Sequence, residues 1–551
     1  MTNPLLPARS GGRSWRRRGA AAGLCSAVAL AGLAAPAAPT GALASAAAQA
    51  APRHLDLGPA DLPESRTTRT LQRGVTLTRI TRGTHDASLR WTEEMLIPSS
   101  ETSPDPDAPP RSLSDRASAR AEAARLADKG FDARVERVRQ PRMADVEPGI
   151  LGYRVRVGSF ETQQEADAEK ARLAAAGETA STVYTGWDGR QTDRGPWHVN
   201  VLRIDPRRFT GSLTGSFGPD LFQRETTSQL ALLGGATAAV NGGYFVLDPL
   251  AGAPGDPAGA GVYAGQVLSE AIDGRPALIL HSGARHSSIV RMRWAGRMRV
   301  GGIATRLDGV NRVPGLIRNC GGDATDEPTS QPLHDFTCTD DAELVAFTPQ
   351  YGESTPEGAG REVVVDHGVV SAVLETRGTT LSRGQRSVQA TGSDTDLLAG
   401  VRVGDRLRLR LQLLTRGERL RTPRGMTVTN GGPLLMRHGR IRVTQRSDGF
   451  VRPGDPSFAY GFVIKRNPRT FAGIDRRGRT VLITVDGRTA DDLGLSVLES
   501  AHVARSLGLV DAINLDGGGS TTMVVDGTVI SHPSDTTGER PVGDALLIGR
   551  R

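Results

Sequence analysis

The stretch AINLDGGGSTTMVVDG, residues 512–527, joins two apolar segments through an acidic residue, three consecutive glycines and three hydroxyl side chains. Aspartate and glycine are poor strand formers, and a glycine in a strand pattern often marks a close approach of another group to the backbone. Packing alone does not explain so polar a turn between two apolar segments. We therefore expect this turn to form part of a ligand site.

The residues before this turn predict a strand, a helix and a second strand. The strands are RTVLITVDG (479–487) and VDAINLD (510–516), and the helix between them begins at a capping box of Ser496 and Glu499 and ends before Gly508. A crossover of this kind is right-handed and makes the two strands parallel. We therefore predict a βαβ unit in the C-terminal third of the chain.

Parallel strands would deliver Asp486 and Asp516 to the same edge of the sheet, where ligands bind in open α/β sheets. Two carboxylates on one rim suit cleavage of a glycosidic bond, because one can protonate the leaving oxygen while the other assists attack at the anomeric carbon. Their separation, which decides between retaining and inverting chemistry, does not follow from the sequence. For Asp486, which precedes Gly487, a turn-capping role is the alternative.

Three turns repeat one pattern, an asparagine at a strand end followed by glycines. They are Asn241-Gly-Gly, Asn430-Gly-Gly and Asn514-Leu-Asp-Gly-Gly-Gly. Glycines expose backbone amides and let a ligand approach, while asparagine supplies directed hydrogen bonds. The recurrence predicts one shared polar cleft, although each turn taken alone also fits an ordinary hairpin connection.

The first 50 residues predict a secretory signal peptide. A basic stretch, SWRRRG (14–19), precedes an apolar run (20–35) and small residues up to ASAAAQA (44–50). We therefore expect a protein that is secreted or held in the cell wall, exported through either the general or the twin-arginine route. No second apolar run is long enough to span a membrane.

Most of the basic charge belongs to this signal. The chain has 551 residues and a formal charge of +8, but five arginines and no acids lie in residues 1–50, so the mature chain carries +3. Such a balance argues against a nucleic-acid partner.

Two cysteines, Cys320 and Cys338, remain after the signal. An exported chain favours a disulfide between them, which would stabilise the fold by about 3 kcal/mol in the chain-entropy model. A catalytic or metal-binding thiol has no support, because no CxxC motif is present.

The chain after the signal divides into a small and a large domain. We predict a disordered lead-in at 51–84, a βαββαβ domain at 85–186 and a polar linker at 187–196. Residues 197–551 show short strands separated by glycines, with few helices. They predict one β-rich α+β catalytic domain, in which residues 285–420 form a mostly β insertion that carries the disulfide.

The small domain resembles a known family. The segment GYRVRVGSFETQQEADAEKARLAAAG (152–177) resembles the SPOR domain, whose members bind peptidoglycan glycan strands. The resemblance implies a wall-binding module. An adaptor domain of the same topology without a ligand is the alternative.

The large domain resembles the phosphodiester glycosidase family. The resemblance rests on AAVNGGYF, TVTNGG, RNPRTFAGIDRRGRTVLITVDGR, NLDGGGSTTMVVDG and HPSDTTGERPVGDALLI, in this order. It implies hydrolysis of a glycosidic bond, either at a sugar 1-phosphodiester or, as in some bacterial relatives, within D-arabinan of actinobacterial cell walls. The substrate-binding residues carried over are Asn241, Gly242, Gly243, Tyr244, Asn430, Gly431, Gly432, Arg469, Arg488, Asn514, Gly517, Gly518, Gly519, Ser520 and Thr521, beside the catalytic candidates Asp486 and Asp516.

One departure from the family pattern concerns the first turn. Many relatives have Asn-Ala-Asp where this chain has Asn241, Gly242 and Gly243. If that acid is catalytic in those relatives, Asp248 and Asp256 are the nearest replacements in this sequence.

We therefore expect a secreted hydrolase of cell-envelope glycans. The alternatives are a non-catalytic wall-binding protein and a phosphodiesterase that cuts the P–O bond. No metal or cofactor is expected; the acidic turns would permit calcium, but no ligand spacing requires it.

Overall fold

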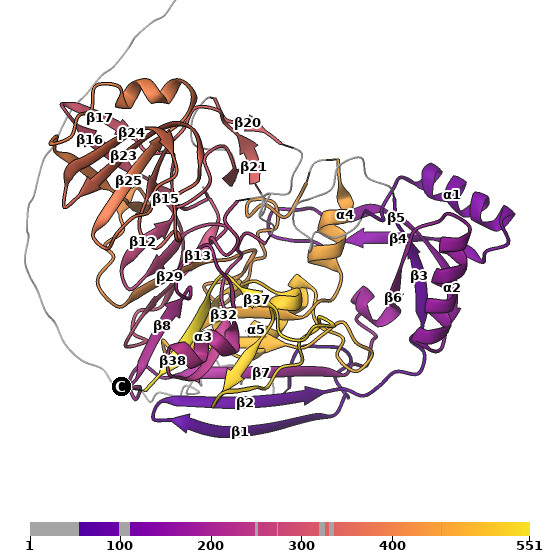
Figure 1. The fold of residues 1–551 in the computed structure, drawn as a ribbon. Helices are drawn as coiled ribbons and strands as arrows, with labels where there is room; N and C mark the ends of the chain where they lie inside the picture. Colours follow the sequence, from indigo (N-terminus) through magenta and orange to yellow (C-terminus); the bar gives the residue numbers. More distant parts are fainter. Residues whose placement is uncertain are drawn as a thin grey trace, which may run out of the picture. The chain divides into compact units, whose positions relative to one another are not determined.

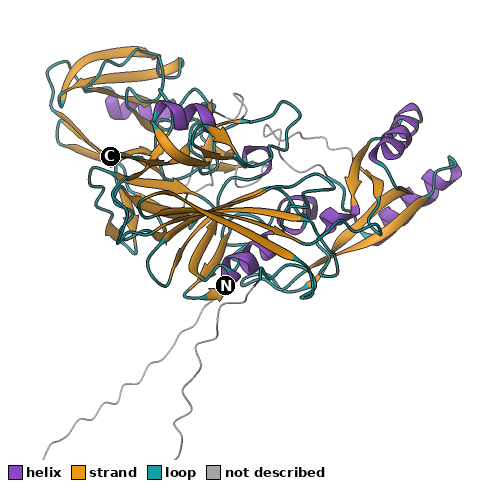
Figure 2. Cartoon of the chain, turned by 90° about the horizontal axis from the view of Figure 1, so that it is seen from below, coloured by secondary structure: helices purple, strands orange, loops and turns teal. Residues whose placement is uncertain are grey.

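The computed structural model describes residues 54–97, 111–247, 252–272, 274–318, 325–329, 336–452 and 454–550. Strands predominate over helices in these residues (Figures 1 and 2). The β-rich α+β class predicted from the sequence is thus confirmed. No helix within the described ranges is long and apolar enough to cross a membrane. The predicted signal peptide at 1–50 lies outside these ranges.

The small domain has the element order β-α-β-β-α-β that the sequence predicts. Its elements are β3 (Trp91–Met95), α1 (Arg116–Asp128), β4 (Ala133–Gln140), β5 (Gly149–Phe160), α2 (Gln163–Ala175) and β6 (Ala180–Tyr184). The four strands form an antiparallel sheet in the order β4-β5-β3-β6. Figure 1 shows α1 and α2 beside this sheet.

Helix caps fix where the two helices of the small domain begin, and alternating side chains decide which face of its sheet they cover. Asp115 caps α1, and Thr162 begins α2 with a reciprocal capping box to Glu165. Val155 and Val157 of β5 belong to one buried core with leucines of both helices, so they face α1 and α2. The residues that alternate with these valines therefore point to the other face of the sheet.

Two buried arginines occupy that other face. Arg154 and Arg156 each form ion pairs of 2.8 Å with Asp188, and Arg156 also pairs with Glu94 at 2.9 Å. Arg154 also hydrogen-bonds the hydroxyl of Tyr460, which belongs to the large domain. The predicted linker at 187–196 therefore begins with a buried ion-pair partner and is a packed part of the structure.

The main sheet of the large domain has eight strands. In spatial order they are β1 (Glu64–Gln72), β2 (Val75–Arg82), β7 (Trp197–Ile204), β33 (Thr480–Val485), β32 (Arg469–Asp475), β34 (Leu509–Asn514), β30 (Leu434–Arg437) and β31 (Arg440–Ile441).

The prediction of a disordered lead-in at 51–84 is wrong, because β1 and β2 lie within it. Strand β2 pairs with β7 along its whole length, from Val75 opposite Ile204 to Arg82 opposite Trp197. Threonine and arginine separate its few apolar side chains, of which Val75 and Leu77 enter one core and Ile80 another. The polar composition and the broken alternation hid this strand.

The predicted βαβ unit is wrong in one respect. Strands β33 and β34 are not neighbours, because β32 lies between them and is antiparallel to both. The short turn around Gly478 folds β32 and β33 into a hairpin, and helix α5 (Val497–Ser506) then returns the chain to the far side of β32. Two strands that are each antiparallel to β32 run parallel to one another, so Asp486 and Asp516 still follow strand ends at the same sheet edge.

Two further sheets pack with the main one. The first contains β36 (Thr528–Val529), β35 (Met523–Val525), β10 (Ala236–Asn241), β38 (Ala545–Gly549) and β8 (Ser212–Ser216), and the second β12 (Gln266–Ser269), β11 (Gly261–Tyr263), β29 (Met426–Asn430), β13 (Pro276–His281) and β14 (Ser288–Arg291). One apolar core joins side chains of all three sheets, including Leu482, Leu546 and Leu278. Helix α3 (Thr227–Leu233) precedes β10.

The regular structure in the described part of residues 285–420 is mostly strand, as the sequence predicts. Their main sheet contains β18 (Gly309–Val310), β22 (Leu344–Phe347), β25 (Gln385–Ala390), β23 (Gly358–Asp366) and β24 (Val369–Arg377), over a separate apolar core. Cys338 is buried in β21 (Phe336–Thr339), whereas Cys320 lies outside the described residues. Their disulfide stays a prediction.

Candidate functional site

The three asparagine-glycine turns meet around Tyr244. Asn430 accepts a hydrogen bond from the Tyr244 amide and donates one to its carbonyl, at 3.2 and 2.9 Å. Asn514 donates to the Tyr244 hydroxyl at 2.8 Å, and Asn241 donates to the backbone carbonyl of Asp516 at 2.8 Å. All three asparagines are buried. Their side chains therefore fix the backbones of the turns and are not free to contact a substrate.

The glycines of the 517–519 turn leave room for charged side chains. A Cβ on Gly518 would lie 3.0 Å from a guanidinium nitrogen of Arg488, and one on Gly519 would overlap Arg540 and Asp535. Arg540 and Asp535 form a bidentate ion pair with distances of 2.7 and 2.9 Å. The turn is thus rich in glycine because these charged groups lie directly against its backbone.

A small pocket of about 70 Å³ opens beside this turn, and we call it the Asp516 pocket. Asp516, which is half-buried, lines it together with three buried or half-buried arginines and several aromatic and small residues. The lining residues are Tyr244, Phe245, Leu247, Gly461, Phe462, Asn467, Arg469, Arg488, Asp516, Gly517, Gly518, Ser520 and Arg540.

Arg469 is the most deeply buried cation in this lining, with 1% of its surface exposed. Its hydrogen bonds go to the backbone carbonyl oxygens of Leu495 at 2.9 Å and Phe462 at 2.5 Å, with a longer one to Lys465. Burial lowers the pKa of Arg469 to about 10, so the side chain stays protonated at neutral pH. These acceptors are neutral carbonyls, and the negative charge of Glu499 acts on Arg469 without a hydrogen bond to it among the described residues. A guanidinium in the lining of a pocket can bind an anion.

Arg488 adds a second positive charge. Burial lowers its pKa, while the charges of Asp535 and Asp516 oppose that shift. Its guanidinium donates a hydrogen bond of 3.3 Å to the side-chain oxygen of Asn467. Arg488 has a positive φ of 65°, a conformation rare outside glycine and asparagine, and such strain is typical of functional positions.

The structure brings some predicted site residues to the pocket and places others behind it. Those in the lining are Tyr244, Arg469, Arg488, Asp516, Gly517, Gly518 and Ser520. Those outside the lining are Asn241, Gly242, Gly243, Asn430, Gly431, Gly432, Asp486, Asn514, Gly519, Thr521 and Asp256. Asp248 lies outside the described residues, directly after the lining residue Leu247.

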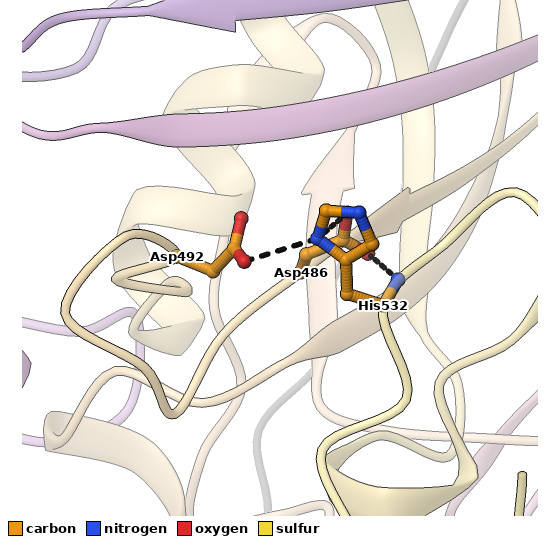
Figure 3. Close-up of side chains that lie close together, drawn as sticks. All are labelled: Asp486, Asp492 and His532. Carbon is orange, nitrogen blue, oxygen red and sulfur yellow. Dashed lines mark hydrogen bonds and ion pairs between the residues drawn. The ribbon is translucent and has the colours of Figure 1, made fainter. Parts of the chain in front are cut away.

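The predicted pairing of Asp486 with Asp516 in one groove is not observed. Asp486 instead lies with Asp492 and His532, as Figure 3 shows. The His532 amide donates a hydrogen bond of 3.1 Å to Asp486, and burial raises the pKa of this carboxyl to about 6. The two strands deliver both acids to one sheet edge, but the Asp486 side chain turns towards the 531–538 loop.

A buried carboxylate does lie against the first turn, but it comes from Asp544. It accepts hydrogen bonds from the Gly243 amide at 2.8 Å, the Tyr263 hydroxyl at 2.9 Å and the Thr429 hydroxyl at 3.0 Å. Burial raises the pKa of Asp544. A Cβ on Gly242 would overlap this carboxylate, which explains glycine at that position.

Sequence reasoning missed Asp544, Asp535 and Arg540. All three lie in the motif HPSDTTGERPVGDALLI that supported the family resemblance. Its unusual density of charges within a mostly apolar region was the signal that could have revealed them.

A larger cavity, of about 1160 Å³, lies between the small domain and helix α5. Its lining includes Glu136, Arg154, Tyr460 and His502, but none of the predicted site residues. We place the chemistry at the smaller pocket, because an acid and three arginines converge there.

Comparisons with known proteins assign two parts of the chain to known families. Residues 359–549 match the phosphodiester glycosidase family, and residues 111–185 match the SPOR domain. The family match contains the whole lining of the pocket except residues 244–247.

Individual relatives are similar over shorter or longer stretches. The N-acetylglucosamine-1-phosphodiester alpha-N-acetylglucosaminidase of Bos taurus is 38% identical over 102 residues, covering 18% of this chain and 19% of that protein. The Mus musculus enzyme is 47% identical over 74 residues, covering 13% and 14%. This chain thus matches less than a fifth of the length of either relative.

A solved structure from Burkholderia pseudomallei K96243 is similar over nearly the full length. It has a TM-score of 0.79 and 32% identity, and the match covers 90% of this chain and 98% of that one. The two-domain arrangement is therefore shared. This chain contains a domain of the phosphodiester glycosidase family, preceded by a SPOR domain.

Proposed function

We propose that the Asp516 pocket hydrolyses the glycosidic bond of a sugar 1-phosphodiester. One observation carries this proposal: Arg469 is buried in the pocket lining, its hydrogen-bond acceptors among the described residues are backbone carbonyls, and Arg488 lines the same pocket. Guanidinium groups donate parallel hydrogen bonds that match phosphate oxygens. The mammalian relatives are named for cleavage at such a phosphodiester.

Hydrolysis of a sugar phosphodiester needs only one carboxylate, and Asp516 is the one among the described lining residues. A phosphate leaving group departs as an anion and is far less basic than a sugar alkoxide, so it needs no proton from a second acid. The arginines would take up the charge that develops on the phosphate as the C–O bond breaks. Asp516 would then act at the anomeric carbon, either as the nucleophile or as the base that activates water.

Cleavage within arabinan is the second candidate substrate class. A sugar leaving group needs a general acid, and Asp516 is the one carboxylate among the described lining residues. Asp248 would have to supply the second carboxylate, since it follows Leu247 in the sequence. The arginines in the lining favour the phosphodiester over this alternative.

The test uses the mature chain with N-acetylglucosamine 1-phosphodiesters and, in parallel, with arabinan. Hydrolysis in oxygen-18 water should place the label on the sugar, and the anomer released first shows whether configuration is retained. Label on the phosphate would instead show P–O cleavage. Asp516→Asn should abolish sugar release, with little change in melting temperature.

A matched control is Asp526→Asn. Asp526 lies ten positions later in a β-turn with a φ of 49°, which asparagine tolerates well, and half of its side chain is exposed. This variant should keep full activity. Equal activity in Asp516→Asn and Asp526→Asn would exclude Asp516 as the catalytic carboxylate.

The SPOR domain supports a location of the protein at the cell envelope. We infer that it holds the exported enzyme on peptidoglycan glycan strands, where wall polymers linked through sugar phosphates are within reach. Sedimentation of the full mature chain with purified sacculi tests this. Binding without sugar release from any substrate would favour the non-catalytic wall-binding alternative.

A further inference from the structure

Three potential metal ligands converge next to the Asp516 pocket, on segments that are distant in the sequence. Asp486 follows strand β33, Asp492 lies in the loop before α5, and His532 follows strand β36. Figure 3 shows the three side chains directed towards one another. One donor atom from each lies within 4.8 Å of the other two.

The spacing of these atoms suits a bound ion. His532 Nδ1 lies 3.1 Å from an oxygen of Asp492 and 3.8 Å from Oδ2 of Asp486. Ligands that each lie about 2.1 Å from a metal are separated by roughly 3.0–3.4 Å in octahedral or tetrahedral geometry. Small side-chain rotations would therefore bring all three donors onto one centre.

A second observation points to a missing partner. Asp486 has only 2% of its surface exposed, and its Oδ1 accepts the His532 amide. Its Oδ2 makes no hydrogen bond to any residue that the structure describes, and it faces the cluster at the 3.8 Å distance to His532. Asp486 is thus a nearly buried carboxylate whose second oxygen is left to water or a cation.

A second histidine supports the cluster from outside. His198 Nδ1 lies 2.5 Å from Oδ1 of Asp492, while Oδ2 of the same carboxylate faces His532. Ligating carboxylates in metal sites are commonly held by such outer hydrogen bonds. Asp492 is thereby fixed with one oxygen directed at the centre.

We propose that Asp486, Asp492 and His532 bind one divalent transition-metal ion of the Zn²⁺ type. The mixed set of two carboxylate oxygens and one imidazole nitrogen favours such an ion over Ca²⁺, which takes six to eight oxygen ligands. The His532 side chain is 62% exposed, so water can complete the coordination. This site is separate from the proposed glycosidase chemistry and does not depend on it.

The ion would join two segments that build the rim of the Asp516 pocket. Asp486 lies two residues before Arg488, and His532 lies three residues before Asp535, the partner of Arg540. Binding would hold the 531–540 loop against the end of β33. We therefore expect a more stable loop and better-fixed arginines in the metal-bound protein.

The test is calorimetric titration of the chelator-treated, tag-free mature chain with Zn²⁺, Mn²⁺ and Ca²⁺ chlorides. We expect one Zn²⁺ per chain, tighter than Ca²⁺, and a higher melting temperature at saturation. His532→Ala should weaken Zn²⁺ binding by at least about tenfold and remove the thermal shift. Asp492→Asn, which keeps the side-chain shape, should do the same.

The matched control is His367→Asn. His367 also forms an aspartate-histidine pair, with Asp366, but it is exposed and lies in the insertion. This variant should bind Zn²⁺ like the wild type. Absence of saturable binding at millimolar ion, undiminished binding in His532→Ala, or a preference for Ca²⁺ over Zn²⁺ would each overturn the proposal.

Discussion

Asn241 holds the backbone of Asp516 through a hydrogen bond of 2.8 Å, although 275 residues separate them. The other end of the same amide accepts hydrogen bonds from the Thr470 hydroxyl at 2.6 Å and the Thr522 amide at 3.1 Å. We predict that Asn241→Ala destabilises the fold by about 2–3 kcal/mol, because buried partners lose their hydrogen bonds. It should also lower kcat more than it raises KM, because Asp516 loses its position. Urea denaturation and steady-state kinetics check both effects.

Asn200→Ala is the control for this prediction. Asn200 is also buried in the main sheet, but its side-chain hydrogen bond to Thr484 is long and weak, at 3.4 Å. This variant should cost less stability and leave kcat unchanged. If both variants reduced kcat equally, the positioning role of Asn241 would be refuted.

Gly519 is the position where the turn is most crowded. An added Cβ would overlap Arg540 and Asp535, so Gly519→Ala should push apart their ion pair and disturb the pocket rim. We predict a loss of about tenfold or more in kcat/KM, equivalent to about 1.4 kcal/mol, with a lower melting temperature. Kinetic assays and thermal unfolding measure these changes.

Gly400→Ala provides the comparison, since a Cβ at Gly400 would meet no atom within 4 Å. That variant should have wild-type activity and equal or slightly greater stability. Wild-type activity in Gly519→Ala would show that the Arg540–Asp535 pair does not contribute to the site.

The position of the site was predictable from the sequence, but the roles of its residues were only partly so. Repeated asparagine-glycine turns marked segments that do meet around Tyr244, because a polar turn after a buried strand needs specific partners. Sequence periodicity does not show which way a side chain at a strand end turns. Asp486 therefore joined Asp492 and His532, and Asn241 became an internal support.

Strand pairing was the least predictable part of the fold. The helix between β33 and β34 was correctly recognised from its capping box, and it does make the strands parallel. The sequence could not show that β32 fills the space between them, because that depends on long-range pairing. For the same reason the sequence does not reveal β1 and β2, which are rich in polar residues and are held by pairing with distant strands.

Arg488 should contribute to the binding of a charged substrate. We predict that Arg488→Gln raises KM for a sugar phosphodiester about tenfold to a hundredfold, since a hydrogen bond to a charged group contributes about 1.5–3 kcal/mol. Hydrolysis of an uncharged aryl glycoside of the same sugar should change little. Parallel kinetics on both substrates separate a phosphate contact from general damage.

The exposed Arg477, in the β32–β33 turn at the other end of these strands from the pocket, supplies the control for that experiment. Arg477→Gln makes the same chemical change outside the pocket and should leave both substrates unaffected. An equal loss on charged and uncharged substrates in Arg488→Gln would contradict the assignment of Arg488 to the phosphate.

The buried ion pairs between the two domains should make the free energy of unfolding depend on pH. Burial alone would raise the pKa of Glu94, but the charges of Lys465, Arg156 and Arg154 outweigh it and lower the pKa from 4.5 to about 2. A carboxylate with a depressed pKa stabilises the fold above its unfolded pKa, and this contribution is lost as the pH falls through the folded value. The wild type should therefore lose about 3 kcal/mol from this group between pH 5 and pH 2.

Glu94→Gln tests this dependence directly. The variant should be less stable at neutral pH, because three cations lose a buried counter-charge, and its stability should fall less steeply between pH 5 and pH 2. Urea denaturation at several pH values measures both effects. Glu147→Gln changes an acid that is 80% exposed in the same domain, so it should keep the wild-type profile. A Glu94→Gln profile parallel to that of the wild type would show that this ion-pair network does not set the acid stability.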